Sequence, residues 1–159
     1  MLNIRNATRE DVSTLLELIR ELATYEKKRE KAVVTETDLV RDAFGTAPKF
    51  RALIAEWSGE PAGYASFFYF YSTFQGRAAL FLEDLFVMEN FRGNGIGKAL
   101  LAAVAKLAIE ENCSGLRWEV LDWNHPAIEF YEKLGADFLH ERKVVAFDEE
   151  GLRRVVQGK

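Results

Sequence analysis

The sequence of 159 residues contains one cysteine, three prolines and two histidines. One cysteine excludes an internal disulfide framework and a zinc site built from several cysteines, and it suits a reducing cytoplasm. No apolar stretch approaches the roughly 18 residues that a membrane span needs. The N-terminus lacks a basic segment followed by an apolar one, so no signal peptide is expected. We therefore predict a cytoplasmic protein that binds no metal and no membrane.

Charged residues show a small acidic excess. Lysine and arginine number 21 and aspartate and glutamate number 25, which gives a formal net charge of −4. Because binding to phosphates requires a basic face, this balance argues against a nucleic acid partner. The length and the 48% hydrophobic fraction predict a single globular domain over residues 1–159.

The hydrophobic pattern changes between helical and strand periods along the chain. Three strand-like runs separated by turn signals predict an antiparallel meander, and a later strand, helix and strand predict a βαβ crossover. The fold class is therefore α/β, a mixed sheet with antiparallel N-terminal strands, flanked by helices. The predicted strands are Leu2–Arg5, Phe50–Trp57, Ala62–Tyr71, Ala78–Val87, Leu116–Leu121 and the last strands within Phe138–Phe147, followed by a turn at residues 148–151. Helices are predicted after Thr8, from Thr35 to Gly45, and over Ile96–Ile109 and Ala127–Leu134.

Two of these helices carry the same start signal. Thr8 with Asp11, and Thr35 with Asp38, resemble capping boxes in which Asp replaces Glu. Gly45 follows the second helix, and a glycine at that position predicts a left-handed cap.

A glycine-rich loop between a predicted strand and a predicted helix is the most informative segment. Gly93, Gly95 and Gly97 lack side chains, which lets a ligand approach the main chain closely. The free N–H groups and the dipole at the start of a helix favour an anion, and Arg92 and Lys98 add positive charge. The loop therefore predicts a pyrophosphate site.

Other glycine-rich loops fit this segment less well. A Walker A loop needs Ser or Thr after its Gly-Lys pair, whereas Ala99 follows Lys98. A Rossmann loop has the spacing G-x-G-x-x-G, whereas this loop has G-x-G-x-G. A glycine-rich turn without a ligand is the remaining alternative, but three glycines within five residues cost stability and indicate a reason for their presence.

The motif Arg92-x-x-Gly95-x-Gly97 resembles the R/Q-x-x-G-x-G/A acyl-CoA loop of the GNAT N-acetyltransferases, and the order of predicted elements resembles that fold over nearly the whole chain. Four stretches are similar to one branch of the family, the diamine (spermidine/spermine) and thialysine acetyltransferases. The resemblance implies acetyl-CoA as co-substrate, a small-molecule amine as acceptor and a homodimer. The four stretches are ELATYEK at Glu21–Lys27, FYFYSTFQGR at Phe68–Arg77, LEDLFVMENFRGNGIG at Leu82–Gly97 and VLDWNHPAIEFYEKLGA at Val120–Ala136.

Two catalytic residues follow from this resemblance. An alkylammonium of pKa ~10.4 needs roughly 4–5 kcal/mol to lose its proton at pH 7, and the resemblance implies that Glu83 assists as the nearby carboxylate. Strand alternation puts Glu83 and its neighbour Asp84 on opposite faces unless a bulge intervenes. The resemblance makes Tyr131 the general acid that protonates the CoA thiolate, since a phenol is protonated at neutral pH. From the residues alone, edge-strand or salt-bridge carboxylates remain equally open, and a lone tyrosine is more commonly a packing residue.

The resemblance also assigns binding residues. It implies that the main chain from Leu85 to Val87 holds the pantetheine arm and stabilises the oxyanion. Asn124, a helix cap by its position, would also form a hydrogen bond with the pantetheine amide. Tyr25 and Glu26 would bind a second ammonium group. The assigned cofactor-binding residues are Leu85, Phe86, Val87, Arg92, Gly93, Asn94, Gly95, Ile96, Gly97, Lys98, Asn124 and Ala127, and the substrate-binding residues are Tyr25, Glu26, Glu83 and Asp84.

The chain departs from the branch pattern at two places. Ser72, Thr73 and Phe74 occupy the turn in which polyamine-specific members carry an Asp, and the segment HERKVVAF lacks the Trp found near the acceptor. The turn is more similar to the thialysine type. The predicted function is direct acetyl transfer from acetyl-CoA to a small primary amine, either thialysine-like or lysine-like, or a diamine or polyamine. The alternatives are an acetyltransferase for protein lysines or N-termini and a non-catalytic CoA-binding module.

Overall fold

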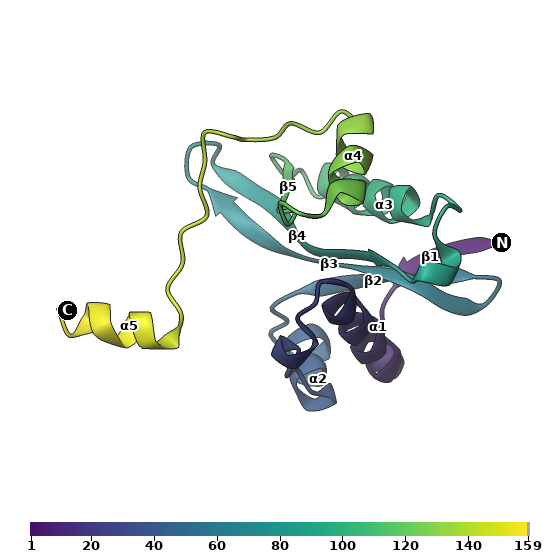
Figure 1. Ribbon diagram of the computed structural model, residues 1–159, viewed down its shortest axis with the longest axis horizontal. Coiled ribbons are helices and arrows are strands. Elements are labelled where there is room, and N and C mark those ends of the chain that lie inside the picture. The colour runs from purple at the N-terminus through teal and green to yellow at the C-terminus, as the bar shows by residue number, and fades with distance from the viewer. Residues whose placement is uncertain (159) are drawn as a thin grey trace. The chain divides into compact units, whose positions relative to one another are not determined.

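The computed structural model describes residues 1–158, which divide into two compact units, Met1–Glu119 and a second unit that begins at Val120 (Figure 1). The first unit is built on a sheet with the strand order β1-β2-β3-β4-β5. Neighbouring strands are antiparallel from β1 to β4, and β5 runs parallel to β4, which confirms the predicted mixed sheet. The strands are β1 Leu2–Asn6, β2 Arg51–Trp57, β3 Glu60–Ser72, β4 Arg77–Val87 and β5 Leu116–Trp118.

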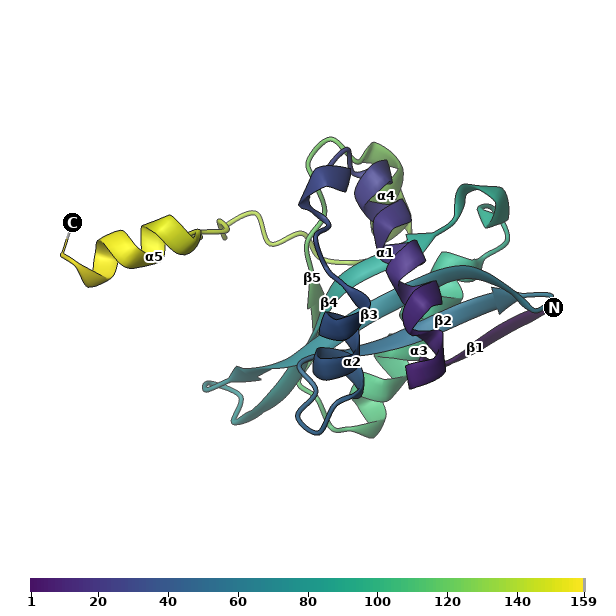
Figure 2. The same ribbon diagram turned by 90° about the horizontal axis from the view of Figure 1, so that it is seen from below.

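Helices cover both faces of this sheet. Helices α1, Val12–Tyr25, and α2, Glu36–Phe44, lie on one face, and α3, Ile96–Glu110, lies on the other (Figures 1 and 2). On the first face, apolar side chains of α1 and α2 pack with Tyr64 and Phe86 of the sheet. On the second face, α3 buries one stripe because its apolar residues recur at helical spacing. The buried stripe of α3 consists of Ile96, Leu100, Leu101, Val104 and Ala108.

Both predicted capping boxes form, but the predicted left-handed cap at Gly45 is wrong. The backbone N–H groups of Thr8 and Thr35 donate to the carboxylates of Asp11 and Asp38 at 2.7 and 2.9 Å. Gly45 has φ −82° and ψ −171°, an extended conformation that any residue adopts. A Cβ at this position would lie 2.3 Å from the carbonyl oxygen of residue 41. Glycine is therefore required here for space, and not for a positive φ.

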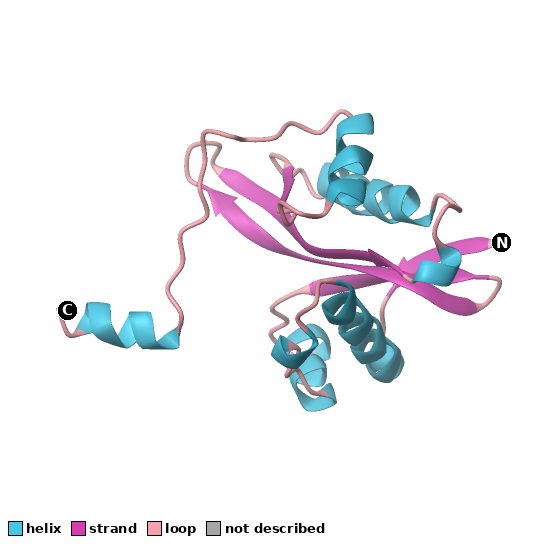
Figure 3. Cartoon of the chain, viewed as in Figure 1, coloured by secondary structure: helices cyan, strands magenta, loops and turns pink. Residues whose placement is uncertain are grey.

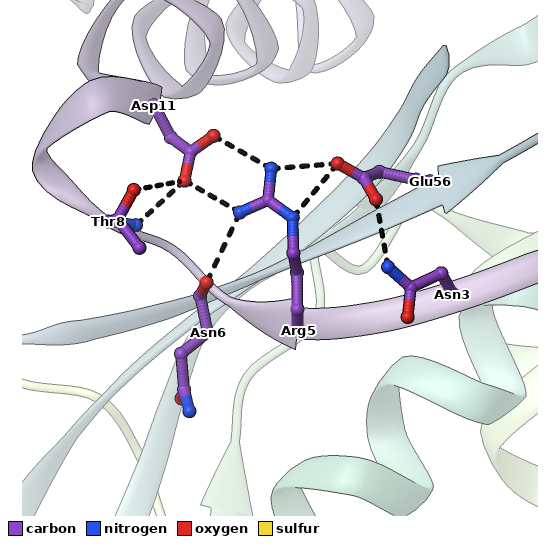
Figure 4. Close-up of polar contacts among 6 residues, drawn as sticks. All are labelled: Asn3, Arg5, Asn6, Thr8, Asp11 and Glu56. Atoms are coloured by element: carbon purple, nitrogen blue, oxygen red, sulfur yellow. Dashed lines mark hydrogen bonds and ion pairs between the residues drawn. The ribbon is translucent and has the colours of Figure 1, made fainter. Parts of the chain in front are cut away.

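An ion-pair cluster joins β1, β2 and the start of α1 (Figure 4). The guanidinium of Arg5 donates to both carboxylate oxygens of Asp11, at 2.7 and 2.8 Å. It also contacts Glu56 of β2 at 2.7 Å, and Asn3 donates to the other oxygen of Glu56 at 2.9 Å. One arginine thus holds together the first turn before α1 and the outer strand pair.

The second unit contains α4, His125–Lys133, and α5, Glu149–Val156, and its remaining described residues form no strand (Figure 3). The strands predicted within Phe138–Phe147 are therefore wrong. Backbone bonds in this segment are local, such as His140 N–H to the Phe138 carbonyl at 2.9 Å, and a strand needs a paired neighbour.

The turn predicted at residues 148–151 is also wrong, because a helix begins there. The Asp148 carboxylate accepts the Gly151 N–H at 2.8 Å, which is a helix cap. The i,i+4 pairs of Glu149 with Arg153 and Glu150 with Arg154 then support α5. Within residues 1–158, no helix combines the length and apolarity that a membrane crossing requires.

Candidate active site

A β-bulge in β4 changes the faces on which its acidic residues lie. Ser66 of β3 pairs with Asp84 and the next residue, Phe67, pairs with Leu82, so Glu83 has no partner on β3. A bulge residue breaks the simple alternation of a strand. The sequence predicted opposite faces for Glu83 and Asp84 only in the absence of a bulge. Because the bulge is present, that prediction does not apply.

Three other carboxylates influence Glu83 at this bulge. Partial desolvation is the main cause that raises the pKa of Glu83, although this residue remains exposed, and the charges of Asp84, Glu119 and Glu26 raise it further. Glu26, which follows α1, also has a raised pKa, caused by burial and opposed by Lys28, with the Asp84 charge adding a smaller upward effect. A cationic substrate would relieve this repulsion. Within residues 1–158, no group of three His, Cys, Asp or Glu side chains could hold a metal ion.

Two residues that the sequence analysis did not single out complete this cluster. The Ser66 hydroxyl donates to Asp84 at 2.6 Å. Tyr64, two residues before Ser66 on β3, is fully buried. Burial is the main cause that raises the pKa of its hydroxyl, and the Asp84 charge raises it further. A buried serine inside the apolar strand YASFF was the available signal, because a buried hydroxyl needs a partner.

Next to these carboxylates, the far edge of β4 lacks a paired strand among the described residues. Strand β5 pairs with β4 only from Leu80 to Leu82 and ends at Trp118, earlier than predicted. In the part of the chain that the structure describes, the β4 main chain from Glu83 to Val87 therefore has no strand on that side. An unpaired edge offers N–H and C=O groups to an extended ligand. The segment Leu85–Val87, predicted to hold pantetheine, lies on this edge.

The glycine loop between β4 and α3, predicted to bind a pyrophosphate, has a backbone conformation that requires glycine at two positions. Gly93 and Gly95 have φ values of +79° and +75°, which side-chain-bearing residues rarely adopt. Ala99 donates the first helical bond, to the Gly95 carbonyl at 3.0 Å, so the preceding amides remain available to a ligand. Ile96 is buried, so any cofactor contact it makes is through its main chain. The Asn94 side chain donates to the Phe91 carbonyl at 3.0 Å and braces the loop.

Arg92 joins this loop to the end of α1. Its Nε donates to the Val87 carbonyl at 3.0 Å. Its guanidinium carbon lies 4.7 Å from the Tyr25 ring centre and 5.8 Å from that of Phe86, distances typical of cation–π contacts. The two rings lie 6.4 Å apart. The structure thus brings predicted acceptor residue Tyr25 next to the predicted cofactor loop.

The second unit carries three further predicted residues. The Asn124 side chain accepts the Ala127 N–H at 3.4 Å, which confirms its role as the cap of α4. Tyr131 on α4 is 7% exposed, and burial raises the pKa of its hydroxyl to about 12. The phenol is therefore protonated at neutral pH and can donate a proton.

Comparisons with known proteins show the family of this chain. The family model of the acetyltransferase (GNAT) family matches residues 13–136. A thialysine N-epsilon-acetyltransferase of Bos taurus is 39% identical over 163 residues, covering 96% of this chain and 95% of that protein. Spermidine/spermine N(1)-acetyltransferase-like protein 1 of Homo sapiens is 34% identical, covering 84% of this chain and 20% of that protein.

The fold also has a close match among solved structures. An integron cassette protein from the mobile metagenome of V. cholerae superposes with a TM-score of 0.83, at 26% identity and covering 98% of each chain. The family match spans most of the chain, and the relatives belong to the branch that the four sequence stretches predicted. The chain belongs to the GNAT acetyltransferase family and is an N-acetyltransferase.

Proposed function

We propose that the protein transfers the acetyl group of acetyl-CoA to a primary amine of a small molecule, by direct transfer in a ternary complex. One observation carries the proposal: β4 bears Glu83 and Asp84 and leads into the glycine loop before α3. A site suited to a cation and a site suited to an anion therefore belong to one strand–loop–helix segment. This is what an amine acceptor and a pyrophosphate-bearing donor require together.

Each reacting group has a residue suited to it. The raised pKa of Glu83 makes its carboxylate a better acceptor for the ammonium proton. Acetyl-CoA supplies the acetyl group as an activated thioester. A main-chain N–H group of Leu85–Val87 can donate a hydrogen bond to the developing oxyanion. Tyr131 keeps its proton at neutral pH and can deliver it to the departing thiolate.

The acceptor is proposed to be of the thialysine or lysine type ahead of polyamines. The hairpin between β3 and β4 has Ser72, Thr73 and Phe74 where an additional carboxylate would favour a polycation. The similarity to a thialysine N-epsilon-acetyltransferase over nearly the whole chain supports the same choice. A homodimer stays a prediction from the resemblance, and light scattering of the purified protein tests it. A cytoplasmic location stays a prediction from the single cysteine and the N-terminal sequence.

The test is release of the CoA thiol from acetyl-CoA by the purified protein. The acceptors are thialysine, lysine, putrescine, spermidine, an aminoglycoside and a lysine-containing peptide. The expected result is a rate with thialysine or lysine that exceeds the rate with spermidine. A rate confined to the peptide would replace the proposal by a protein acetyltransferase. Binding of acetyl-CoA without turnover on any acceptor would leave only a CoA-binding module.

A further inference from the structure

Ser66 and Asp84 form a partly buried hydrogen bond within the carboxylate cluster that is proposed to bind the acceptor. The two residues face each other across β3 and β4, next to the bulge at Glu83. Ser66 is 4% exposed, and its hydroxyl donates to an Asp84 carboxylate oxygen at 2.6 Å. That distance is typical of a charge-assisted bond from a hydroxyl to a carboxylate. The bond therefore favours the charged form of Asp84.

The surroundings of Asp84 otherwise disfavour that form. Burial raises the pKa of Asp84, and the hydroxyls of Ser66 and Tyr64 oppose this effect. The ionised groups that face it, Glu26 from the end of α1 and Glu83 from β4, are both acidic, and Lys28 acts on Glu26.

The Tyr64 hydroxyl is a second potential donor to this carboxylate. It is buried and reaches hydrogen-bonding geometry with no group among the described residues. Ser66 is therefore the hydroxyl that donates to Asp84 in this structure, and the Tyr64 hydroxyl, without a formed bond, lowers the pKa of Asp84 less.

A hydroxyl partner differs from a basic one in its effect on a substrate. Asp84 forms no ion pair within residues 1–158, whereas Asp11 of the same chain is paired with Arg5. A lysine or arginine would neutralise the carboxylate and remove its attraction for an incoming ammonium group. A serine stabilises the charge by one hydrogen bond and leaves that attraction in place.

We propose that Ser66 is a positioning residue that keeps Asp84 charged and oriented for the ammonium group of the acceptor. The inference rests on the proposed function, because it assumes a cationic acceptor at this cluster. It assigns no chemical step to Ser66, which touches Asp84 and not the reacting atoms. Its effect is on recognition of the amine and on the pH range in which recognition occurs.

The experiment compares Ser66→Ala with a matched control, Ser13→Ala. Ser13 also donates its hydroxyl to a carboxylate, Glu36, at 2.7 Å, but joins α1 to α2. We expect Ser66→Ala to raise KM for the amine about three- to tenfold, and to move the acidic limb of kcat/KM upward by about one pH unit. KM for acetyl-CoA stays unchanged, and Ser13→Ala matches the wild type in all three values.

Two more variants separate this role from a general loss of structure. Ser66→Cys keeps a weaker donor of similar shape and is expected to give an intermediate shift. In an Asp84→Asn background, Ser66→Ala is expected to cause no further change in the pH profile. The proposal is overturned if Ser66→Ala leaves the acidic limb of kcat/KM unchanged. It is also overturned if Ser66→Ala shifts this limb as much in the Asp84→Asn background as in the wild type.

A titration of Asp84 decides the matter independently of turnover. Carbon-13 NMR of the Asp84 carboxyl group measures its pKa in the wild type and in Ser66→Ala. A higher pKa in the variant supports the proposal, and an equal pKa overturns it. If no amine is acetylated, the proposed function fails, while this titration still decides whether Ser66 keeps Asp84 charged.

Discussion

Replacing Asp11 by asparagine tests the ion-pair cluster that joins β1, β2 and the start of α1. The substitution keeps the side-chain shape but replaces one carboxylate oxygen by an NH2 group, which cannot accept a hydrogen bond. In the wild type one of these oxygens accepts from Arg5 and the other accepts from the Thr8 N–H. The Asp11 side chain is only 13% exposed, so water replaces these bonds poorly. Bonds to charged groups contribute about 1.5–3 kcal/mol, and Glu56 still holds Arg5 in the variant. We expect the free energy of unfolding to fall by about 2 kcal/mol at pH 7.

The size of this loss depends on pH, and its sign follows from Asp11. The bonds from Arg5 hold the pKa of Asp11 well below its ordinary value. A group with a depressed native pKa stabilises the fold above its unfolded pKa and loses that contribution as the pH falls through the native pKa. The difference in the free energy of unfolding between the wild type and Asp11→Asn is therefore largest near pH 7, and it shrinks as the pH falls below about 4. Glu56 titrates in both proteins, and loss of the Asp11 charge, which raises the pKa of Glu56, makes a smaller contribution to this difference.

Urea unfolding at a series of pH values between 7 and 3.5 measures the difference directly. Asp42→Asn is the control, because Asp42 pairs with Arg41 in an exposed position where ion pairs contribute little. A loss for Asp11→Asn that is the same at every pH would refute the electrostatic explanation. No loss at pH 7 would refute the stabilising role of the cluster itself.

Three further substitutions test the site and one structural glycine. Gly95→Glu is expected to abolish acetyl-CoA binding in calorimetry, while Gly59→Glu, also at a positive φ, keeps it. Tyr131→Phe should lower kcat about 100-fold or more, with little change in acetyl-CoA affinity, as measured by steady-state kinetics. Gly45→Ala should reduce the free energy of unfolding by about 1–3 kcal/mol through a backbone clash, whereas Gly115→Ala, with open space at its Cβ, should be nearly neutral in urea unfolding.

Each of these predictions has an outcome that contradicts it. Retained cofactor binding in Gly95→Glu would remove the glycine loop from the binding site. An equal loss of kcat and of acetyl-CoA affinity in Tyr131→Phe would point to packing in place of proton donation. A stable Gly45→Ala protein would mean that the end of α2 can shift to accommodate a methyl group.

Local signals in the sequence determined most of the elements. Capping boxes at Thr8 and Thr35, the hairpin turns and the glycine loop before α3 depend on residues within a few positions of one another, so their spacing was sufficient. The family, and with it the predicted roles of Glu83 and Tyr131, followed from motifs that are continuous in the chain. The antiparallel meander and the βαβ crossover followed from the order of these elements.

The tertiary structure decided what depends on a partner distant in sequence. The bulge at Glu83 exists only in the register between β3 and β4, and it determines which carboxylates influence one another. The bond from Ser66 to Asp84 follows from the same pairing, and the contact of Arg92 with Tyr25 follows from the packing of α1 against the sheet. The prediction of strands within Phe138–Phe147 was wrong for a related reason, because strand propensity acts only where a neighbouring strand accepts the hydrogen bonds. Local spacing thus determined the elements and the loop, while the long-range register determined the charge distribution of the proposed acceptor site.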